Sequence, residues 1–290
     1  MVAQPHVGTL GFIVYDITAK RNIYSQNSDS LMRPASCMKL LTCIAALRYL
    51  GTDYKYRNRL YTSGKMVNDT LVGDVVLKTQ FDPCFNRDSL YSLVGALRTK
   101  GIKAVRGRVV LDMAFTDEMA HEEHWIIGDL HLRGIGSLYH GYRRFRNEVI
   151  GAMRYVAGLS LPDSAYVQGR LIPAKSEMIA EINTPLHVVV ESALKYSNNT
   201  SAESLLYPLG YIMNKNGNYR KNGTVLLNNF LKRELGQGGI ASVHDGCGLC
   251  PYDGLTPKIL VSLLDYTYRH PQIYDEVFED LPMGESMMSQ

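Results

Sequence analysis

The sequence predicts an α+β fold in which a small antiparallel sheet packs against helices. Two stretches rich in β-branched and aromatic residues, 7–16 and 22–26, flank a short turn at 18–20 and predict a β-hairpin. A helix is expected directly afterwards, because apolar residues at 40, 41, 44, 47 and 50 recur with helical spacing. A hairpin followed at once by a buried helix favours packing of that helix on the sheet.

Strands and helices are both expected in the rest of the chain. Strands are predicted at 56–61, 71–78, 105–113, 166–171 and 178–182, and helices at 87–100, 147–157, 185–195, 201–213, 224–235 and 257–268. Thr184 is the expected N-cap of its helix, and Pro208 the expected kink in the next one. The stretch 114–146 has the least regular pattern.

Composition and charge exclude several classes of protein. The chain has 290 residues, 46% of them hydrophobic and 20% charged, which is typical of a globular protein of one large domain or two. A net charge of +3 argues against an extended nucleic-acid surface. No apolar run is long enough to span a membrane, and the first residues do not form a signal peptide. The protein is therefore expected to be cytosolic, or to be exported by a signal that this sequence does not include.

The stretch Ser36-Cys37-Met38-Lys39 is the first candidate for chemistry. Pro34 suits a helix start, so Ser36 is expected at or inside the first turn. Residues three apart share a helix face, which places Lys39 beside Ser36. A desolvated lysine amine can take the proton of a serine hydroxyl and make it a nucleophile. The alternative is an ordinary serine N-cap.

A second candidate follows the 185–195 helix, at Ser197-Asn198-Asn199. The Ser197 hydroxyl can relay a proton, and the Asn199 side chain can hold a substrate amide. Clusters of Ser and Asn also form turns, so this pattern is weak alone. S-x-x-K followed by S-x-N beside predicted helices is a stronger signal, because the pair belongs to penicillin-binding proteins and class A β-lactamases.

Two further clusters suggest metal or redox chemistry, and neither matches a known pattern. The histidines of His121-Glu122-Glu123-His124 are spaced differently from those of the zinc motifs. Cys247 and Cys250 form a C-x-x-C without a second pair, in a chain with an odd number of cysteines, 5. No metal site and no cofactor are expected.

The chain resembles the class C low-molecular-mass penicillin-binding proteins, the D-alanyl-D-alanine carboxypeptidase/endopeptidase family. The resemblance extends over nearly the whole chain. The blocks that match are an opening strand at 11–16, a P-A-S-x-x-K-L-L-T block at 33–42, a G-x-[IVL]-x-x-D strand at 107–112 and a D-G-S-G-L-S block at 244–250, where Cys247 and Cys250 replace serines.

The resemblance implies a penicillin-binding/β-lactamase-like transpeptidase fold with an inserted mixed α/β domain. The peptidase domain would comprise 1–57 and 176–290, and the inserted domain 58–175. Ser36 would be the acylated nucleophile, with its backbone N–H as one oxyanion donor, and Lys39 would be its base. Ser197 would relay protons, and Asn199 would position the peptide amide.

The resemblance also implies a substrate and a place. The substrate would be the peptide stem of peptidoglycan, cut at D-Ala-D-Ala or at a D-amino-acid cross-link. β-Lactam antibiotics would acylate the same serine as covalent inhibitors. The implied location is periplasmic or otherwise extracytoplasmic, with no nucleic-acid partner and no membrane span.

The chain departs from the family pattern at its third motif. No K-T-G or H-T-G follows Ser197, and Lys221-Asn222-Gly223-Thr224 has the wrong order and precedes the 244–250 block. We therefore expect a chain truncated before this motif, with the last strands of the sheet missing and activity impaired. The alternatives are a serine β-lactamase, which the inserted region argues against, and a non-catalytic peptidoglycan-binding or scaffold protein.

Overall fold

The computed structural model describes residues 9–114, 137–215 and 217–282, which form two compact units. Within these ranges, the first unit comprises 9–53 and 187–282, and the second comprises 54–114 and 137–186. The boundaries predicted from the sequence lie after residue 57 and before residue 176. The structure places the boundaries elsewhere because the two strands that enter and leave the second unit pair with each other over most of their length.

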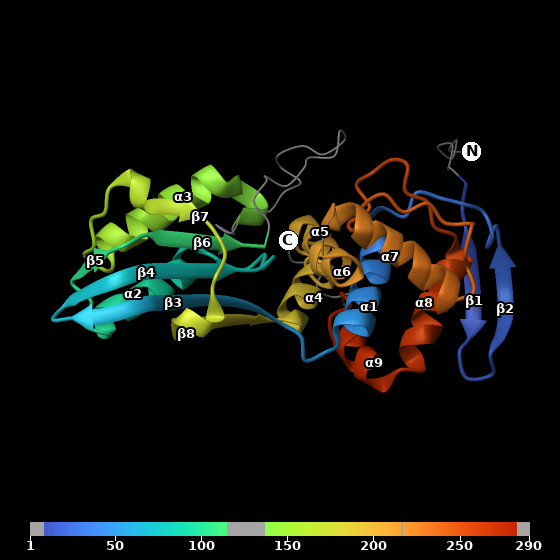
Figure 1. Ribbon diagram of the computed structural model, residues 1–290. Helices are drawn as coiled ribbons and strands as arrows, with labels where there is room; N and C mark the ends of the chain where they lie inside the picture. The colour runs from blue at the N-terminus through green and yellow to red at the C-terminus, as the bar shows by residue number, and fades with distance from the viewer. Residues whose placement is uncertain (1–8, 115–136, 216, 283–290) are drawn as a thin grey trace, which may run out of the picture. The chain divides into compact units, whose positions relative to one another are not determined.

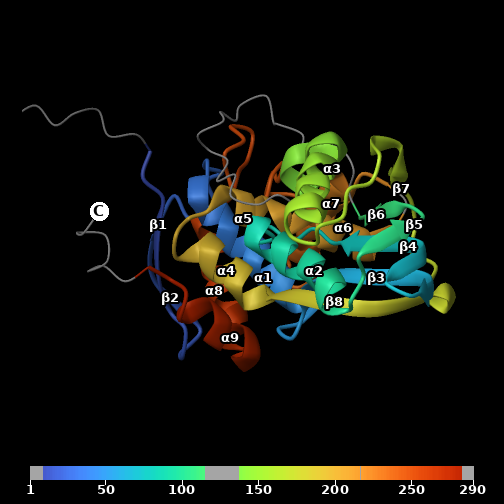
Figure 2. The ribbon, with the colours of Figure 1, turned by 90° about the vertical axis from the view of Figure 1, so that its left-hand side faces the viewer.

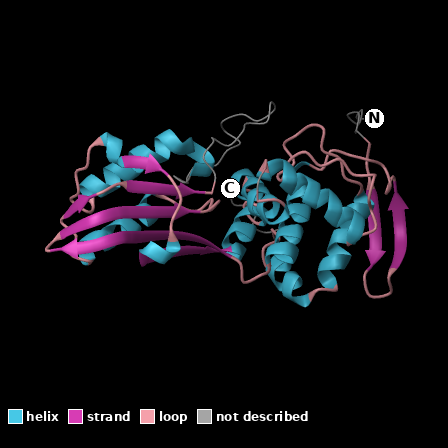
Figure 3. Ribbon diagram, in the orientation of Figure 1, coloured by secondary structure: helices cyan, strands magenta, loops and turns pink. Residues whose placement is uncertain are grey.

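The second unit is built on a mixed six-stranded sheet (Figures 1 and 3). Its strand order is β7 (Tyr166–Gln168), β6 (Val109–Met113), β4 (Thr70–Thr79), β3 (Lys55–Val67) and β8 (Ser176–Pro185), with β5 (Ala104–Arg106) also paired to β4. Strand β3 is antiparallel to both of its neighbours, whereas β4, β6 and β7 run parallel. The strand expected at 105–113 is thus two short strands, β5 and β6.

Helices α2 (Arg87–Thr99) and α3 (Ser137–Tyr155) contact each other and pack on one face of this sheet (Figure 2). The Asn86 side chain caps α2 by accepting a hydrogen bond from the Ser89 backbone N–H at 3.0 Å. Helix α3 begins earlier than predicted and bends at Gly141, whose φ is 64°. The core between sheet and helices consists of side chains such as Leu60, Val75, Leu77, Leu111, Phe85, Leu93, Leu97, Phe145 and Val149.

The first unit is mainly helical and surrounds one buried helix, α1 (Met38–Leu50). Helices α5 (Asn199–Ser204), α6 (Leu206–Met213), α7 (Tyr219–Arg233), α8 (Pro257–Tyr268) and α9 (Pro271–Phe278) all contact α1 (Figure 1). Most of the 13 residues of α1 are buried, on all sides of the helix, as expected for a central helix. None of the helices that the structure describes has the length and apolar character needed to cross a membrane.

Two sequence predictions around α4 (Leu186–Leu194) and α6 were wrong. Thr184 is not an N-cap: it lies in β8, and its hydroxyl donates to the buried carboxylate of Asp82 at 2.8 Å. The break in the 201–213 helix falls at Leu205, between α5 and α6. Pro208 lies in the first turn of α6, where a backbone N–H has no helical acceptor in any case, so the proline fits without a kink.

The predicted hairpin is present as β1 (Phe12–Asp16) and β2 (Arg21–Gln26), an antiparallel pair that contacts α8 through β1. Every residue of β2 is exposed. Among the described residues no third strand joins this sheet. Apolar side chains therefore face solvent on both strands, including Phe12, Val14, Ile23 and Tyr24.

The core of the second unit can be tested at Phe145, which is 0% exposed and contacts the ring of Phe85. Phe145→Ala should lower the free energy of unfolding by about 3–5 kcal/mol, because it removes a large buried side chain and leaves a cavity. Tyr155→Ala is the matched control on the same helix, since Tyr155 is 79% exposed. Urea unfolding and hydrogen exchange at the β6 amides would measure the change. Equal losses in both variants would contradict this account of the core.

Candidate active site

Ser36 lies in the short 3-10 turn η1 (Ala35–Cys37) that leads into α1. Its side chain is exposed, whereas Lys39, in the first turn of α1, is only 1% exposed. Lys39 Nζ donates a hydrogen bond to Ser36 Oγ at 2.9 Å. The spacing of three residues therefore places the amine beside the hydroxyl, as the sequence predicted.

Ser197 reaches the same oxygen from a distant part of the chain. It follows α4 in a left-handed backbone conformation with φ of 52°, which few residues other than glycine adopt. Its Oγ donates a hydrogen bond to Ser36 Oγ at 2.9 Å, across 161 residues of sequence. Ser36, Lys39 and Ser197 thus form one hydrogen-bonded cluster.

Asn199 lies two residues further on, as the first residue of α5, and is half-buried. The cap of α5 is its neighbour Asn198, whose side chain accepts a hydrogen bond from the Ser201 N–H at 3.1 Å. The cleft lining that the structure describes does not include Asn199. Its predicted contact with a substrate amide stays a prediction.

The three clustered side chains open into a cleft of about 860 Å³ in the first unit. Leu40 of α1 and Leu260 and Leu264 of α8 contribute apolar side chains to its lining. The rest of the lining consists of Cys37, Ala193, Leu194, Lys195, Tyr196, Leu281 and Pro282. The cleft is large enough for a peptide-sized ligand and gives it direct access to Ser36.

Burial controls the charge of Lys39. Desolvation lowers the pKa of the Lys39 amine from its usual 10.5, against the opposing influence of the Asp245 carboxylate. Besides Ser36, Nζ donates to the backbone carbonyl of Cys247 at 3.1 Å. The amine is thus held by two neutral oxygen atoms, in surroundings that favour its unprotonated form.

Cys247 and Cys250 lie in a buried loop whose backbone is organised by Asp245. The Asp245 carboxylate accepts hydrogen bonds from the N–H groups of Cys247 at 2.9 Å and Cys250 at 2.8 Å. Burial raises the pKa of the Cys247 thiol, so this thiol stays protonated. The contribution of residue 247 to the cluster is its carbonyl oxygen, which reasoning from side-chain types did not identify.

Two clusters of the chain contain side chains that can bind metal ions. Ligand atoms of Glu203, Asp245 and Cys247 lie within 4.8 Å of one another and are buried. Glu203, however, already accepts a hydrogen bond from the Gly246 N–H at 2.7 Å and is paired with the Arg220 guanidinium. Carboxylates that already bind backbone N–H groups and a guanidinium are suited to fixing the backbone and have little capacity left to bind a metal ion. The cluster at 121–124 lies outside the described residues.

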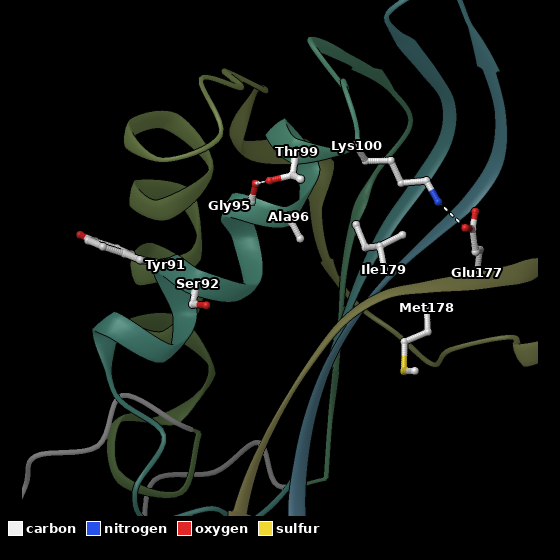
Figure 4. Close-up of a pocket in the computed structure, with 9 residues that line it drawn as sticks. All are labelled: Tyr91, Ser92, Gly95, Ala96, Thr99, Lys100, Glu177, Met178 and Ile179. Carbon is white, nitrogen blue, oxygen red and sulfur yellow. Dashed lines mark hydrogen bonds and ion pairs between the residues drawn. The ribbon is translucent and has the colours of Figure 1, made fainter.

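A second cleft, of about 640 Å³, lies in the second unit between α2 and the start of β8 (Figure 4). Tyr91, Ser92 and Thr99 line it from α2, and Met178 and Ile179 from β8. An ion pair between Lys100 and Glu177 crosses it (Figure 4). The cleft contains none of the side chains predicted to carry chemistry, so the candidate active site is the cluster at Ser36.

Comparison with known proteins identifies relatives over most of the chain. The model of the family described as "D-Ala-D-Ala carboxypeptidase 3 (S13) family" matches residues 1–134 and 155–285. The D-alanyl-D-alanine carboxypeptidase DacB of Haemophilus influenzae is 22% identical over 346 residues, which cover 92% of this chain and 72% of that protein.

Solved structures confirm the predicted fold. Penicillin binding protein 4 (dacB) of Haemophilus influenzae, complexed with a novel β-lactam, superposes with a TM-score of 0.75 at 20% identity, over 96% of this chain and 78% of that one. A predatory endopeptidase of Bdellovibrio bacteriovorus in complex with an immunity protein gives 0.58 at 18% identity, over 89% and 70%. Because the family model matches most of its length, the chain belongs to the D-Ala-D-Ala carboxypeptidase 3 (S13) family.

Proposed function

We propose that this protein is a serine D,D-peptidase that cleaves the D-Ala-D-Ala end, or a D-amino-acid cross-link, of peptidoglycan stem peptides through an acyl-Ser36 intermediate. The observation that carries the proposal is the position of Ser36 Oγ, 2.9 Å from both Lys39 Nζ and Ser197 Oγ. A hydroxyl between a buried amine and a second hydroxyl has a base to activate it and a route for its proton.

In the first step the Ser36 hydroxyl gives its proton to the neutral Lys39 amine, and Oγ forms a bond to the substrate carbonyl carbon. The C–N bond then breaks, and the proton passes from Lys39 through Ser197 to the departing amine. Negative charge develops on the carbonyl oxygen, and the backbone N–H of Ser36 and the N-terminus of the helix are proposed to stabilise it; the location of Ser36 at the start of α1 supports this role.

In the second step water hydrolyses the ester, with the Lys39 and Ser197 pair acting again as proton acceptor and relay. A β-lactam enters the same sequence because its ring amide presents an equivalent carbonyl, and its opened ring stays attached to Ser36. Asn199 is proposed to position the peptide amide of the substrate. It follows Ser197 by two residues in the sequence, which supports this role.

The proposed substrate also fixes where the protein would act. Peptidoglycan is assembled outside the cytoplasmic membrane, so a peptidase for its stem peptides works in an extracytoplasmic compartment. We propose the periplasm, with peptidoglycan peptides as the natural partner and β-lactams as covalent inhibitors.

The nucleophile and its base can be tested by labelling with a fluorescent penicillin. Ser36→Ala should abolish covalent labelling, and Lys39→Ala should slow it by orders of magnitude, because the serine loses its activating base. Ser25→Ala and Lys232→Ala are the controls, since both side chains are exposed and neither lines the cleft. Label that persists on Ser36→Ala would overturn the assignment, and rapid turnover without a lasting adduct would indicate a β-lactamase.

The rate of acylation should rise with pH. The Lys39 amine acts as a base only when unprotonated, and burial lowers its pKa below the usual 10.5, so the rise should be centred below that value. Stopped-flow or quenched-flow acylation by benzylpenicillin, measured wherever the protein remains folded, would give the profile. A rate that falls over this range would exclude a neutral lysine as the base.

The two loop cysteines should be replaceable by serine. Residue 247 contributes a carbonyl to the site, and both N–H groups are bound by Asp245 whatever the side chain. The Cys247→Ser, Cys250→Ser double variant should therefore keep its fold and its rate of acylation. Metal analysis and thermal melts are the checks. Stoichiometric zinc in the purified protein, lost in this variant together with a large fall in Tm, would show a metal site instead.

A further inference from the structure

The Lys39 amine needs a defined orientation as well as a lowered pKa. In the 2.9 Å contact the Lys39 amine donates to Ser36 Oγ. A neutral amine has two N–H donors and one lone pair, and to accept the Ser36 proton it must turn the lone pair toward that hydroxyl. The Cys247 carbonyl, 3.1 Å from Nζ, can only accept a hydrogen bond. An N–H held by this carbonyl therefore limits the directions open to the lone pair, and the position of the carbonyl helps to set the geometry of proton transfer.

The Cys247 carbonyl is held in place by a loop wrapped around one carboxylate. Asp245 is 0% exposed and accepts three backbone N–H groups, from Cys247 at 2.9 Å, Gly248 at 2.5 Å and Cys250 at 2.8 Å. Among the described residues, no other side chain of the loop accepts hydrogen bonds from three of its backbone N–H groups. The loop backbone therefore takes its shape from Asp245.

The same loop is hydrogen-bonded to α1, the helix that carries Lys39. The Thr42 hydroxyl, one turn along α1 from Lys39, donates to the Gly246 carbonyl at 2.8 Å. The Gly246 N–H in turn donates to Glu203 at 2.7 Å. The backbone carbonyl and N–H of Gly246 are thus both hydrogen-bonded to buried side chains. Helix α1 and the loop form one hydrogen-bonded assembly.

The loop also contacts the turn that carries the nucleophile. A Cβ atom placed on Gly248 would lie 1.8 Å from the Ala35 carbonyl oxygen, so the two backbones touch at a distance that only glycine permits. Gly248 has a φ of +84° as well. One loop therefore contacts the residue before Ser36 and, through the Cys247 carbonyl, the amine of Lys39.

We propose that Asp245 is a positioning residue for acylation, which fixes the Cys247 carbonyl and through it directs the Lys39 amine toward Ser36. This inference rests on the proposed function of the Ser36 cluster. It assigns a role to the 244–250 block that the mechanism above does not use.

The charge of Asp245 provides a second connection to Lys39. Burial acts to raise the pKa of Asp245, but the three backbone N–H groups act against it, and the pKa is lowered. The neighbouring Asp253 has a raised pKa, because it is buried beside the Asp245 charge. Ionised Asp245 raises the pKa of Lys39 against the effect of burial.

Two substitutions of Asp245 separate its charge from its geometry. Asp245→Glu keeps the charge but moves the carboxylate by one methylene, so the maximal acylation rate should fall on the order of 10–100-fold with little change in the pH of its rise. Asp245→Asn removes the charge and one acceptor, so the rate should also fall and the rise should shift to lower pH. Asp16→Asn is the control, because Asp16 accepts two backbone N–H groups in the hairpin turn, away from the cleft.

Acylation by benzylpenicillin, followed by intact-protein mass spectrometry over a range of pH, gives these quantities. Hydrogen exchange at the amides of Cys247, Gly248 and Cys250 reports on the loop without penicillin and should quicken in both variants. Wild-type protein that is not acylated would contradict the proposed function. If the wild-type protein is acylated and the Asp245 variants react at the same rate with the same pH profile, this inference alone is overturned. Unchanged hydrogen exchange at the loop amides would overturn it as well.

Thr42→Val keeps the test decisive if the Asp245 variants do not fold. Valine matches threonine in shape but cannot donate to the Gly246 carbonyl, so one connection between α1 and the loop is lost. Its maximal acylation rate should fall by several-fold while its Tm stays within a few degrees of the wild-type value. A wild-type rate in this variant, with folded protein shown by a thermal melt, would count against the loop as the device that orients Lys39.

Discussion

The burial of a single amine governs the arrangement of the first unit. Lys39 lies on a helix that is enclosed on all sides, so its amine must find partners inside the protein or carry a large desolvation penalty. The partners that the structure provides are a hydroxyl and a backbone carbonyl, both neutral. A carboxylate in direct contact would have held a proton on the amine. Neutral acceptors instead allow burial to favour the basic form, which is the form that activates a serine.

Local backbone strain is concentrated around the same amine. Ala35 and Ser197 both have positive φ, 45° and 52°, and they stand next to the nucleophile and at the relay hydroxyl. Such conformations are unfavourable for residues with a side chain and persist where the surroundings enforce them. At Ala35 the enforcing contact is the Gly248 backbone, and at Ser197 it is the turn that follows α4. The loop and the strained turns together bring two side chains, Lys39 and Ser197, to one oxygen atom, Ser36 Oγ.

Sequence reasoning succeeded where the determinant was local. The three-residue spacing of Ser36 and Lys39 fixes their contact once a helix forms, and the helix predicted at 257–268 is present as α8. It failed where tertiary contacts compete with local preference, as at Thr184, whose hydroxyl bonds a buried carboxylate in place of a helix end. The Cys247 carbonyl could not have been identified from residue types, since every residue has a carbonyl and only the folded loop selects one. Ser197 required the resemblance, because nothing in its own sequence points across 161 residues.

The pairing of the two chain segments that bound the second unit has a consequence for biosynthesis. The Leu186 N–H donates to the Tyr54 carbonyl at 2.9 Å, so the chain enters and leaves the second unit at nearly the same point. The entropic cost of bringing the ends of this segment together grows only slowly with the length of the segment, and pairing of β3 with β8 offsets that cost. On the ribosome, however, the apolar helix α1 emerges well before α5 to α9, which must cover it. Until those helices are made, the apolar side chains of α1 are uncovered, so slow synthesis through residues 54–186 would expose the nascent chain to aggregation.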